Sequence, residues 1–509
     1  MLSKIKSMSL QGLDGYLVDV QVDISAGIPS FDIVGLPDVT IREARERIKT
    51  AIKNSGFYMY SKKILVNLAP ATQKKEGSFF DLPIAIGVLC ANEIIYKKIE
   101  NTVFIGELSL DGRINKINGV LPMCVELAKL GVKRVIVPKE NAKEASIVKE
   151  IEVIAVSNLK ETVDYLNGEK EIQSEKHNEI DVFENNIETL LDFAEVKGQR
   201  NIKRAVEVAA SGGHNLLMIG SPGSGKTMIA KRIPTILPDL SFEESLEITK
   251  IYSISGNLNN NNSIIKNRPF RSPHHTISPV SLVGGGRYPK PGEISLAHFG
   301  VLFLDELPEF NRNTLEVLRG PLEDGEITIG RVSQVLTYPS EFMLVASMNP
   351  CPCGFYGSEK ECRCSPQSIK KYISKLSGPL LDRIDIQVGV SSVKYENLNS
   401  NIKEETSKEI KERVNKARQI QIKRYKDYNI YSNSQLTPKL IEKFCKLNNE
   451  SKEVLEKVFE KLGLSARAYG RILKVARTIA DLDASENIET KHILEAIQYR
   501  CLDKKYSNL

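Results

Sequence analysis

The stretch Gly220-Ser221-Pro222-Gly223-Ser224-Gly225-Lys226-Thr227 decides the fold of this 509-residue chain. An apolar run, Asn215 to Ile219, precedes it, and a helical pattern follows from Met228. Strand, glycine-rich turn and helix N-terminus are the parts of a phosphate-binding loop, in which backbone N–H groups converge on the phosphates and the helix dipole favours the anion. We therefore predict that Lys226 holds the β- and γ-phosphates of a nucleotide and that Thr227 ligates Mg²⁺.

Two further apolar strands are followed by polar residues suited to nucleotide hydrolysis. The run Val301 to Leu304 ends in two carboxylates. We expect Asp305 to bind Mg²⁺, directly or through water, and Glu306 to orient and activate the attacking water. The run Phe342 to Met348 ends in Asn349. A strand-end asparagine is often only a turn former, but its place after the Asp-Glu strand favours a role in positioning the lytic water. Together these residues predict hydrolysis of ATP or GTP.

Three regions can be distinguished along the chain. Residues 1–166 mix β-rich stretches with amphipathic helical ones such as Ile41 to Asn54, and residues 167–188 are polar and charged, as in a linker. Residues 189–392 carry the phosphate loop and short apolar runs typical of buried parallel strands. Residues 393–509 have apolar residues every three or four positions among many lysines and glutamates, which predicts helices. We therefore expect a multidomain α/β protein.

Composition limits the classes of function. The chain has 70 Lys and Arg against 64 Asp and Glu, a net charge of +6, so any nucleic-acid surface must be a local patch. Met1 to Gly12 has no continuous apolar segment, and the longest apolar stretch, around Leu82 to Ala91, is too short to span a bilayer. Eight cysteines in a chain of this size do not make a disulfide scaffold. We expect a cytoplasmic protein with no membrane association.

The order of the motifs resembles that of the AAA+ ATPases, and the resemblance implies roles for two arginines. In the segment Ser377 to Asp385, it implies that Arg383 reaches the γ-phosphate bound by a neighbouring subunit. An arginine between two aspartates is otherwise interpreted as a surface ion-pair former. In the helical region, Arg467 matches the second-sensor arginine of the helical lid. Arg471 is the alternative for that role, and an exposed basic helix face is the alternative to both.

Several stretches narrow the resemblance to one family. They are Val34 to Pro37, Glu43 to Arg47, Arg268 to Thr276, Gly284 to Gly286, Gly292 to Gly300, Leu318 to Gly325 and the hairpin-like Glu326 to Tyr338. The last three resemble the magnesium-chelatase and replicative-helicase branch of AAA+ proteins, and the first four resemble, within it, the YifB/ComM family of magnesium-chelatase-like proteins, a match that covers nearly the whole chain. In this branch of AAA+ proteins the hairpin faces a central pore, where Arg331 would touch DNA, although an isolated strand arginine is equally interpreted as solvent-exposed.

The family resemblance implies a function. It implies an ATP-dependent homo-hexamer that hydrolyses ATP with Mg²⁺ and acts as a helicase, driving branch migration of branched or single-stranded DNA in homologous recombination and natural transformation, alongside recombination proteins. Three other classes stay open: the ATPase motor of a chelatase-like remodelling complex without direct DNA translocation, an ATP-dependent protease, and a scaffold that only binds ATP. Glu306 disfavours the scaffold, because the carboxylate that activates water is present.

The N-terminal region resembles a protease domain without its catalytic residues. Gly106 to Ile114 and Pro138 to Asn141 resemble the α+β, ribosomal S5-like protease domain of Lon, which uses a Ser–Lys dyad. Here the nucleophile position falls on Phe79 and the lysine position on Met123. Ser78 is one residue away, but a one-residue shift changes where a side chain points. The lysines near it in the sequence are Lys74, Lys75 and Lys116. We expect an inactive domain, with a role in assembly or DNA engagement.

Four cysteines are crowded into the insertion 351–364. Cys351, Cys353, Cys362 and Cys364 form two C-x-C pairs. Four thiolates can hold a tetrahedral Zn²⁺, although structural zinc sites usually space their paired cysteines by two or more residues. A reduced thiol loop and a redox pair are the alternatives. A second candidate, the adjacent His274 and His275, is not predicted to bind metal, because neighbouring side chains on an extended segment point in opposite directions.

Overall fold

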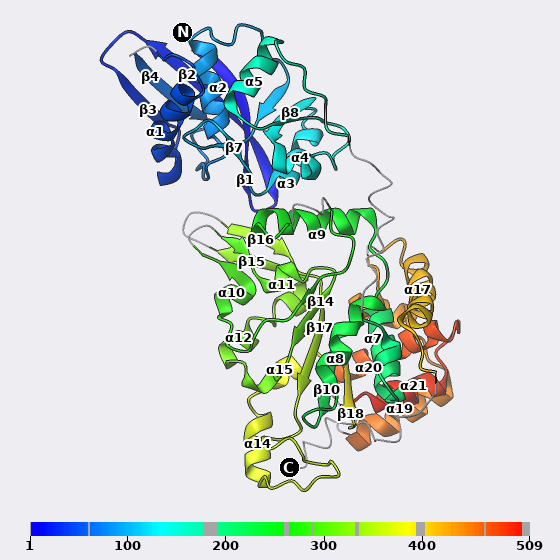
Figure 1. Ribbon diagram of the computed structural model, residues 1–509. Helices are drawn as coiled ribbons and strands as arrows, with labels where there is room; N and C mark the ends of the chain where they lie inside the picture. The colour runs from blue at the N-terminus through cyan, green and yellow to red at the C-terminus, as the bar shows by residue number, and fades with distance from the viewer. Residues whose placement is uncertain are drawn as a thin grey trace. The chain divides into compact units, whose positions relative to one another are not determined.

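The computed structural model describes residues 2–59, 62–176, 191–258, 264–286, 289–330, 335–392, 403–428, 430–462 and 465–500. The chain forms two compact units, shown in Figure 1. The first comprises Met1–Asn185 and Ser245–Lys266, and the second comprises Asn186–Glu244 and Asn267–Leu509. The prediction of a multidomain protein that combines helices and sheets is confirmed.

The first unit is built on a mixed sheet of seven strands. In sheet order they are β3 (Ser30–Val34), β4 (Lys63–Ala69), β2 (Asp14–Ser25), β1 (Leu2–Gln11), β5 (Thr102–Phe104), β8 (Arg134–Pro138) and β9 (Glu152–Val156). β1, β2 and β4 pair antiparallel, whereas β5, β8 and β9 pair parallel. Along β2, Val18, Val20 and Val22 are fully buried and alternate with more exposed neighbours, which is the period of a strand with one face on the core.

Two helices show why this unit forms its own core. α1 (Val39–Asn54) begins two residues before the predicted helix, because the Asp38 carboxylate caps it by accepting a hydrogen bond from the backbone N–H of Ile41 at 2.8 Å. α2 (Asp81–Ala91), which contains the longest apolar stretch, is buried on nearly all sides against the sheet. Among the described residues, no helix combines the length and apolar character needed to cross a bilayer.

Residues that follow the phosphate loop in sequence also belong to the first unit. They are Ser245–Lys266, which include most of α9 (Phe242–Ser255). The carbonyl of Ser253 accepts a hydrogen bond from the backbone N–H of Gly119 at 3.2 Å, and its hydroxyl donates to the carboxylate of Glu144. The remaining elements of this unit are β6 (Glu107–Leu108), β7 (Ile114–Asn115), α3 (Val120–Lys129), η1 (Lys139–Asn141), α4 (Ala142–Ala145) and α5 (Leu159–Asn167). Of the predicted linker, residues 177–188 lie outside the described residues.

The second unit is built on a parallel sheet of five strands. In sheet order they are β11 (Phe270–Arg271), β14 (Val301–Leu304), β17 (Met343–Met348), β10 (Leu216–Gly220) and β18 (Ile386–Val390). Every neighbouring pair runs parallel. β14, β17 and β10 are buried along their whole length, as expected for parallel strands covered on both faces, and these three predicted strands are confirmed.

Helices from both ends of this unit share one core with the sheet. α7 (Arg200–Gly212), α20 (Ala466–Leu482) and α21 (Thr490–Gln498) lie on one side of the sheet (Figure 1). Leu216 and Val345 of the sheet belong to the same buried cluster as Ile472, Ile479 and Ile493 of the C-terminal helices. The other C-terminal helices are α17 (Ser407–Arg424), η5 (Asn433–Gln435), α18 (Pro438–Phe444) and α19 (Asn449–Leu462). The prediction of a helical C-terminal region is confirmed.

A hairpin and several short elements complete the second unit. β15 (Glu326–Gly330) pairs antiparallel with β16 (Val335–Pro339), which confirms the predicted hairpin, whereas Arg331 lies outside the described residues. The short elements are η2 (Phe193–Glu195), α8 (Lys226–Arg232), η3 (Ile233–Thr235), α10 (Pro279–Val283), β12 (Gly284–Gly285), β13 (Lys290–Pro291), α11 (Glu293–Leu296), η4 (Leu307–Glu309), α12 (Arg312–Glu316), α13 (Pro321–Asp324), α14 (Pro366–Ile373) and α15 (Gly378–Leu381).

Candidate active site

The phosphate loop connects the buried strand β10 to α8, as the sequence predicts. Its glycines have two different functions. A Cβ at Gly220 would collide with the backbone carbonyl of Val390, so this glycine allows close packing of β10 on β18. Gly223 and Gly225 have φ values of +77° and +88° and face open space, so they are needed for their left-handed backbone conformation.

Lys226 lies at the centre of the loop. Its Nζ donates to the carbonyl oxygens of Gly220 and Ser221 at 2.7 and 3.0 Å and to Oδ1 of Asn349 at 3.3 Å. Burial lowers the pKa of Lys226, while the charges of Asp305 and Glu306 act in the opposite direction. The sheet therefore brings four residues predicted from three separate motifs to the same edge.

Asp305 is held by three donors. Thr227 Oγ1 donates to its Oδ2 at 2.7 Å, and the backbone N–H of Glu306 donates to its Oδ1 at 3.0 Å. The buried hydroxyl of Ser347 also donates to Oδ1. Because Leu304 pairs with Ala346 in parallel register, Asp305 and Ser347 are the next residues along adjacent strands. Sequence reasoning missed Ser347, because its role depends on this register.

Glu306 follows Asp305 in a strained conformation. Its φ of +53° lies in the left-handed region, which non-glycine residues rarely adopt, and its side chain is exposed. The backbone here turns directly from β14 into η4, so the carboxylate leaves the buried strand and is accessible to solvent. Such strain is common at catalytic positions.

Gln199 is a second residue that the sequence analysis did not identify. It precedes α7 with a φ of +52°, and its Nε2 donates to the carbonyls of Ser224 and Ser391 at 3.0 Å each. It thereby ties the phosphate loop to the residue after β18. A single glutamine in a polar loop carries no signal by which this role could be predicted.

The two arginines singled out in the sequence both lie near Glu323. Arg383 is 9% exposed, and its Nη2 contacts Oε2 of Glu323 at 2.5 Å while Nη1 donates to the carbonyl of Pro379 at 2.8 Å. The hydrogen bond from Arg383 lowers the pKa of Glu323, and the charge of Arg467 adds a smaller contribution. Arg467 is exposed in the first turn of α20. Both arginines therefore lie on the side of the unit that carries Glu323.

Arg471, the alternative to Arg467, has a different environment. Its Nε lies 3.4 Å from Oδ1 of Asp385, whose Oδ2 lies 3.4 Å from Nδ1 of the buried His214. Burial acts to raise the pKa of Asp385, but the hydrogen bond with His214 and the charge of Arg471 outweigh it and hold the pKa below its usual range. These contacts join α20 to the start of β18 and indicate a structural role.

The four cysteines of the insertion lie together. The Sγ atom of Cys351 is 3.4 Å from that of Cys353 and 3.7 Å from that of Cys362, and the latter two are 3.6 Å apart. With Cys364, all four sulfur atoms lie within 4.8 Å of one another. Sulfur ligands of a tetrahedral Zn²⁺, at about 2.3 Å from the metal, stand about 3.8 Å apart, so the cluster has the dimensions of such a site.

Backbone donors also favour thiolates in this cluster. The backbone N–H of Tyr356 donates to Cys351 Sγ at 3.3 Å. A hydrogen bond from the backbone of Phe355 is the main cause that lowers the pKa of Cys353 to about 6. For Cys362, a backbone hydrogen bond from Cys364 acts to lower the pKa, but burial and the hydrogen bonds with Cys353 and Cys351 outweigh it and raise the pKa to about 12; the pKa of Cys364 is raised in the same way. Since metal ions bind the thiolate form of cysteine, the backbone hydrogen bonds at Cys351 and Cys353 are the ones that suit a metal site.

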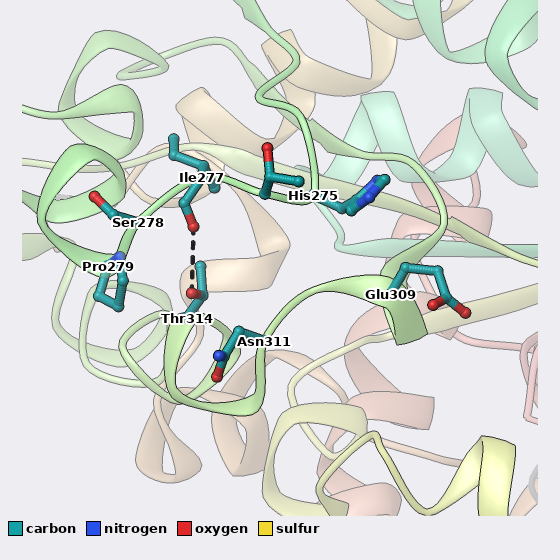
Figure 2. Close-up of a pocket in the computed structure, with 8 residues that line it drawn as sticks. His275, Ile277, Ser278, Pro279, Glu309, Asn311 and Thr314 are labelled. Atoms are coloured by element: carbon teal, nitrogen blue, oxygen red, sulfur yellow. Dashed lines mark hydrogen bonds between the residues drawn. The ribbon is translucent and has the colours of Figure 1, made fainter.

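The histidine pair is arranged differently from the prediction. The rings of His274 and His275 lie 4.1 Å apart rather than pointing in opposite directions, because the chain turns at 275–276 instead of staying extended. His275 lines an open pocket of about 460 Å³ together with Glu309, Asn311 and Thr314 (Figure 2). Within the described residues, the cysteine cluster is the only group of three or more potential ligands close enough to share a metal.

The neighbouring arginines are structural. Arg268 is bound by the carbonyls of Pro238 and Phe299 at 2.6 and 2.7 Å and by the carboxylate of Glu244. Arg271 forms two hydrogen bonds with Glu293, at 2.6 and 2.7 Å. These contacts brace the edge strand β11 and its flanks.

In the first unit, Ser78 and each of the lysines considered for a displaced Ser–Lys pair contact other partners. The hydroxyl of Ser78 donates to the carboxylate of Glu107. The ammonium of Lys75 is buried and donates to the carbonyls of Pro70 and Gln73. Lys74 forms an ion pair with Glu76 at 2.7 Å, and Lys116 donates to the carbonyl of Leu258 at 3.3 Å. Phe79 packs against Phe80, and Met123 is fully buried.

Comparison with known proteins places the chain in a family. Three family models match the chain. One, described as magnesium chelatase, subunit ChlI, matches residues 192–398, and another, described as subunit ChlI of Mg-chelatase, matches residues 20–141. The third, described as magnesium chelatase, subunit ChlI C-terminal, matches residues 404–500. The chain is 43% identical over 518 residues to the competence protein ComM of Haemophilus influenzae, covering 100% of both chains. It is 43% identical over 505 residues to the YifB protein of Escherichia coli, covering 99% of this chain and 98% of the relative.

A partial similarity accompanies these matches. The chain is 29% identical over 170 residues to Lon protease 2 of Bacillus subtilis, which is 30% of each chain. The full-length matches, the three consecutive chelatase regions and the parallel sheet with its phosphate loop agree with one another. The chain therefore belongs to the YifB/ComM family of magnesium-chelatase-like proteins and is an AAA+ ATPase of that family.

Proposed function

We propose that this protein is an ATP-driven motor that works as a homo-hexameric helicase on branched or single-stranded DNA, alongside recombination proteins, in homologous recombination. The observation that carries the proposal is the meeting of Lys226, Thr227, Asp305 and Asn349 at one sheet edge. The 43% identity over the full length to the competence protein ComM supports DNA as the partner and natural transformation as the setting.

In this proposal each residue at the sheet edge has one task in ATP hydrolysis. The loop N–H groups and Lys226 bind the β- and γ-phosphates, and Thr227 and Asp305 are the residues that would hold Mg²⁺. A bound Mg²⁺ neutralises charge that develops on the phosphate oxygens. Glu306 accepts a proton from the attacking water, and Asn349 positions that water in line with the γ-phosphate.

The geometry of the sheet supports a role for Arg383 in a neighbouring subunit. β18 pairs with β10 so that Val390 is opposite Gly220, where the phosphate loop begins. Arg383 precedes the other end of β18, so the five residues of that strand, at about 3.3 Å each, separate it by roughly 16 Å from its own phosphate loop. We propose that Arg383 completes the site of the adjacent protomer in a ring, and that Arg467 is the second-sensor arginine of the helical lid.

The remaining parts of the chain fit this motor. We propose residues 1–166 as an inactive Lon-protease-like domain, 167–188 as a linker, 189–392 as the ATPase core and 393–509 as the helical lid. Phe79 and Met123 support the absence of peptidase chemistry, since neither side chain can act as nucleophile or base. The proposed location is the cytoplasm, where ATP and DNA are available.

We also propose a structural Zn²⁺ held by Cys351, Cys353, Cys362 and Cys364. The sulfur spacing of 3.4–3.7 Å supports it, since it is close to the separation of about 3.8 Å between the sulfur ligands of a tetrahedral Zn²⁺. The metal would supply a rigid cross-link and no chemistry in the hydrolysis itself.

The test of the motor function is the ATPase rate with and without branched or single-stranded DNA, at low and moderate salt. We expect stimulation by DNA that disappears in the Glu306→Gln variant, and strand displacement on a branched substrate that needs ATP. ATPase activity without any DNA binding at low salt would contradict DNA translocation and favour a remodelling ATPase of the chelatase type.

A further inference from the structure

In the sequence, the cysteine cluster lies between Asn349 and helix α14. Cys351 is two residues after Asn349, and Cys364 immediately precedes Ser365, the N-cap of α14. α14 returns to the site, because the hydroxyl of Tyr372 accepts a hydrogen bond from the backbone of Asn349 and the side chain is only 7% exposed. The insertion therefore begins next to Asn349, and the helix that follows it packs back against Asn349 through Tyr372.

A second contact joins the cluster to the phosphate loop. Gly354 has a φ of +84°, and its backbone N–H donates to the carbonyl of Cys351 at 2.9 Å, which closes a tight turn. A Cβ at Gly354 would lie 2.5 Å from Cδ and 2.7 Å from Cγ of Pro222. The backbone of the turn thus packs against the Pro222 ring with no space for a side chain.

The segments that the insertion contacts, around Pro222 and Asn349, both provide acceptors for Lys226. Ser221, next to Pro222, accepts a hydrogen bond from Lys226 Nζ at 3.0 Å, and Asn349 accepts one at 3.3 Å. The turn at Cys351–Gly354 therefore touches the two segments from which this lysine is held. A shift of the turn would move both acceptors relative to the lysine.

The burial pattern indicates what keeps the turn in place. Of residues 351–364, only Cys351 and Gly354 are buried, and the others are exposed or half-buried. The segment has no apolar core of its own, so a metal bound to its four sulfur atoms would be the main source of its order. Of the two buried residues, one is a proposed ligand and the other packs against Pro222.

We propose that metal bound at the cysteine cluster positions Pro222 and Asn349 for the nucleotide, so that occupancy of this site sets the affinity for ATP. The inference rests on the proposed ATPase site and zinc site and adds a positioning role to them. Cys351 and Gly354 are positioning residues, because they act through Asn349 and Pro222 and touch no reacting atom.

The decisive variant is Gly354→Ala in the full-length protein. It retains all four cysteines, so zinc content measured by plasma mass spectrometry should equal that of the wild type. Its Cβ pushes on Pro222, and we expect Kd for a fluorescent ATP analogue with Mg²⁺ to rise about tenfold or more, since misplacement by about 1 Å can cost 100-fold in activity. The matched control is Gly357→Ala, in the same loop with a φ of +71°, which should bind nucleotide like the wild type.

Loss of the metal should act in the same direction. Cys364→Ser should lose zinc and weaken nucleotide binding, whereas Cys90→Ser, a half-buried cysteine of the first unit, should change neither. If Cys364→Ser fails to fold, judged by circular dichroism, the pair Gly354→Ala and Pro222→Ala provides the test. The double variant should bind ATP more tightly than the sum of the single losses predicts, because the smaller side chain removes the collision.

The failures are distinguishable. Wild-type protein that binds ATP but purifies without zinc overturns the proposed zinc site and with it the inference. Protein that holds zinc, but in which Gly354→Ala and Cys364→Ser bind ATP like the wild type, overturns the positioning role and leaves the zinc site standing. Wild-type protein with zinc and no affinity for ATP overturns the proposed ATPase function itself.

Discussion

Nζ of Lys226 lies 3.3 Å from Oδ1 of Asn349, although 123 positions separate the two residues in the chain. The contact follows from the sheet. β10 and β17 are adjacent and parallel, with Ile219 opposite Met348, so the residues that follow each strand meet at the same edge. A γ-phosphate bound to Lys226 is therefore next to the side chain proposed to position the attacking water.

Removal of the Lys226 side chain tests this arrangement. Lys226→Ala should lower the ATPase kcat/KM by about 100-fold or more, because a charge-assisted contact to the transferred phosphoryl group is lost. Lys231, on the same helix α8 but exposed, provides the matched control Lys231→Ala, which should stay near the wild-type rate. Equal activity of the two variants in a coupled phosphate-release assay would contradict the assignment of the phosphate loop.

Mixed rings test whether Arg383 acts in a neighbouring site. Arg383→Ala should be about 100-fold less active than wild type, as should Lys226→Ala. A mixture of these two inactive variants should recover ATPase activity, because some interfaces then combine an intact Lys226 with an intact Arg383 from the next protomer.

The control for the mixing experiment is the double variant Lys226→Ala/Arg383→Ala mixed with either single variant, since such rings contain no complete site. A mixture that stays inactive, although sedimentation shows mixed oligomers, would mean that Arg383 serves its own subunit through its ion pair with Glu323. Arg319→Ala, which removes a half-buried arginine paired with Glu316, should leave the rate unchanged.

The strands and the phosphate loop could be predicted from the sequence because their information is local. The apolar segments 301–304 and 343–348 are buried along their whole length, and the glycines at 223 and 225 satisfy positive φ values. Ser347 could not be found in this way, because a serine within a strand gains its role only from the register that places it beside Asp305. The directions of the two histidine side chains were predicted wrongly for a related reason: a turn at 275–276 brings together two rings that an extended chain would point apart.

Ser347 should affect catalysis more than nucleotide binding. Its hydroxyl donates to Oδ1 of Asp305, while Thr227 donates to Oδ2, so Ser347→Ala leaves that carboxylate free to rotate. We expect kcat to fall about tenfold, the Mg²⁺ concentration for half-maximal activity to rise, and KM for ATP to change little, because partners of this kind orient the group that holds the metal. The control is Ser255→Ala in the first unit, whose hydroxyl donates to the nearby carbonyl of Tyr252 and accepts from the side chain of Asn257. A higher KM for ATP with an unchanged kcat would contradict the role.

Asp81 should make the stability of the first unit depend on pH. Burial raises the pKa of this carboxyl to about 6, although hydrogen bonds from Arg47 at 2.6 and 3.0 Å act to lower it. Because the folded-state pKa exceeds the ordinary value of about 3.9, the stabilising contribution of the protonated form is complete below about pH 4 and is lost as the pH rises through about 6.

The variant Asp81→Asn removes this titration. Between pH 4 and 7, the free energy of unfolding of the wild type should therefore fall by about 2–3 kcal/mol relative to that of Asp81→Asn. Asp111→Asn, at an exposed carboxylate whose pKa is lowered by the backbone N–H and side chain of Arg113, should show no such gain. Calorimetric unfolding across this pH range decides the point, since parallel curves for wild type and Asp81→Asn would mean that Arg47 keeps Asp81 charged throughout.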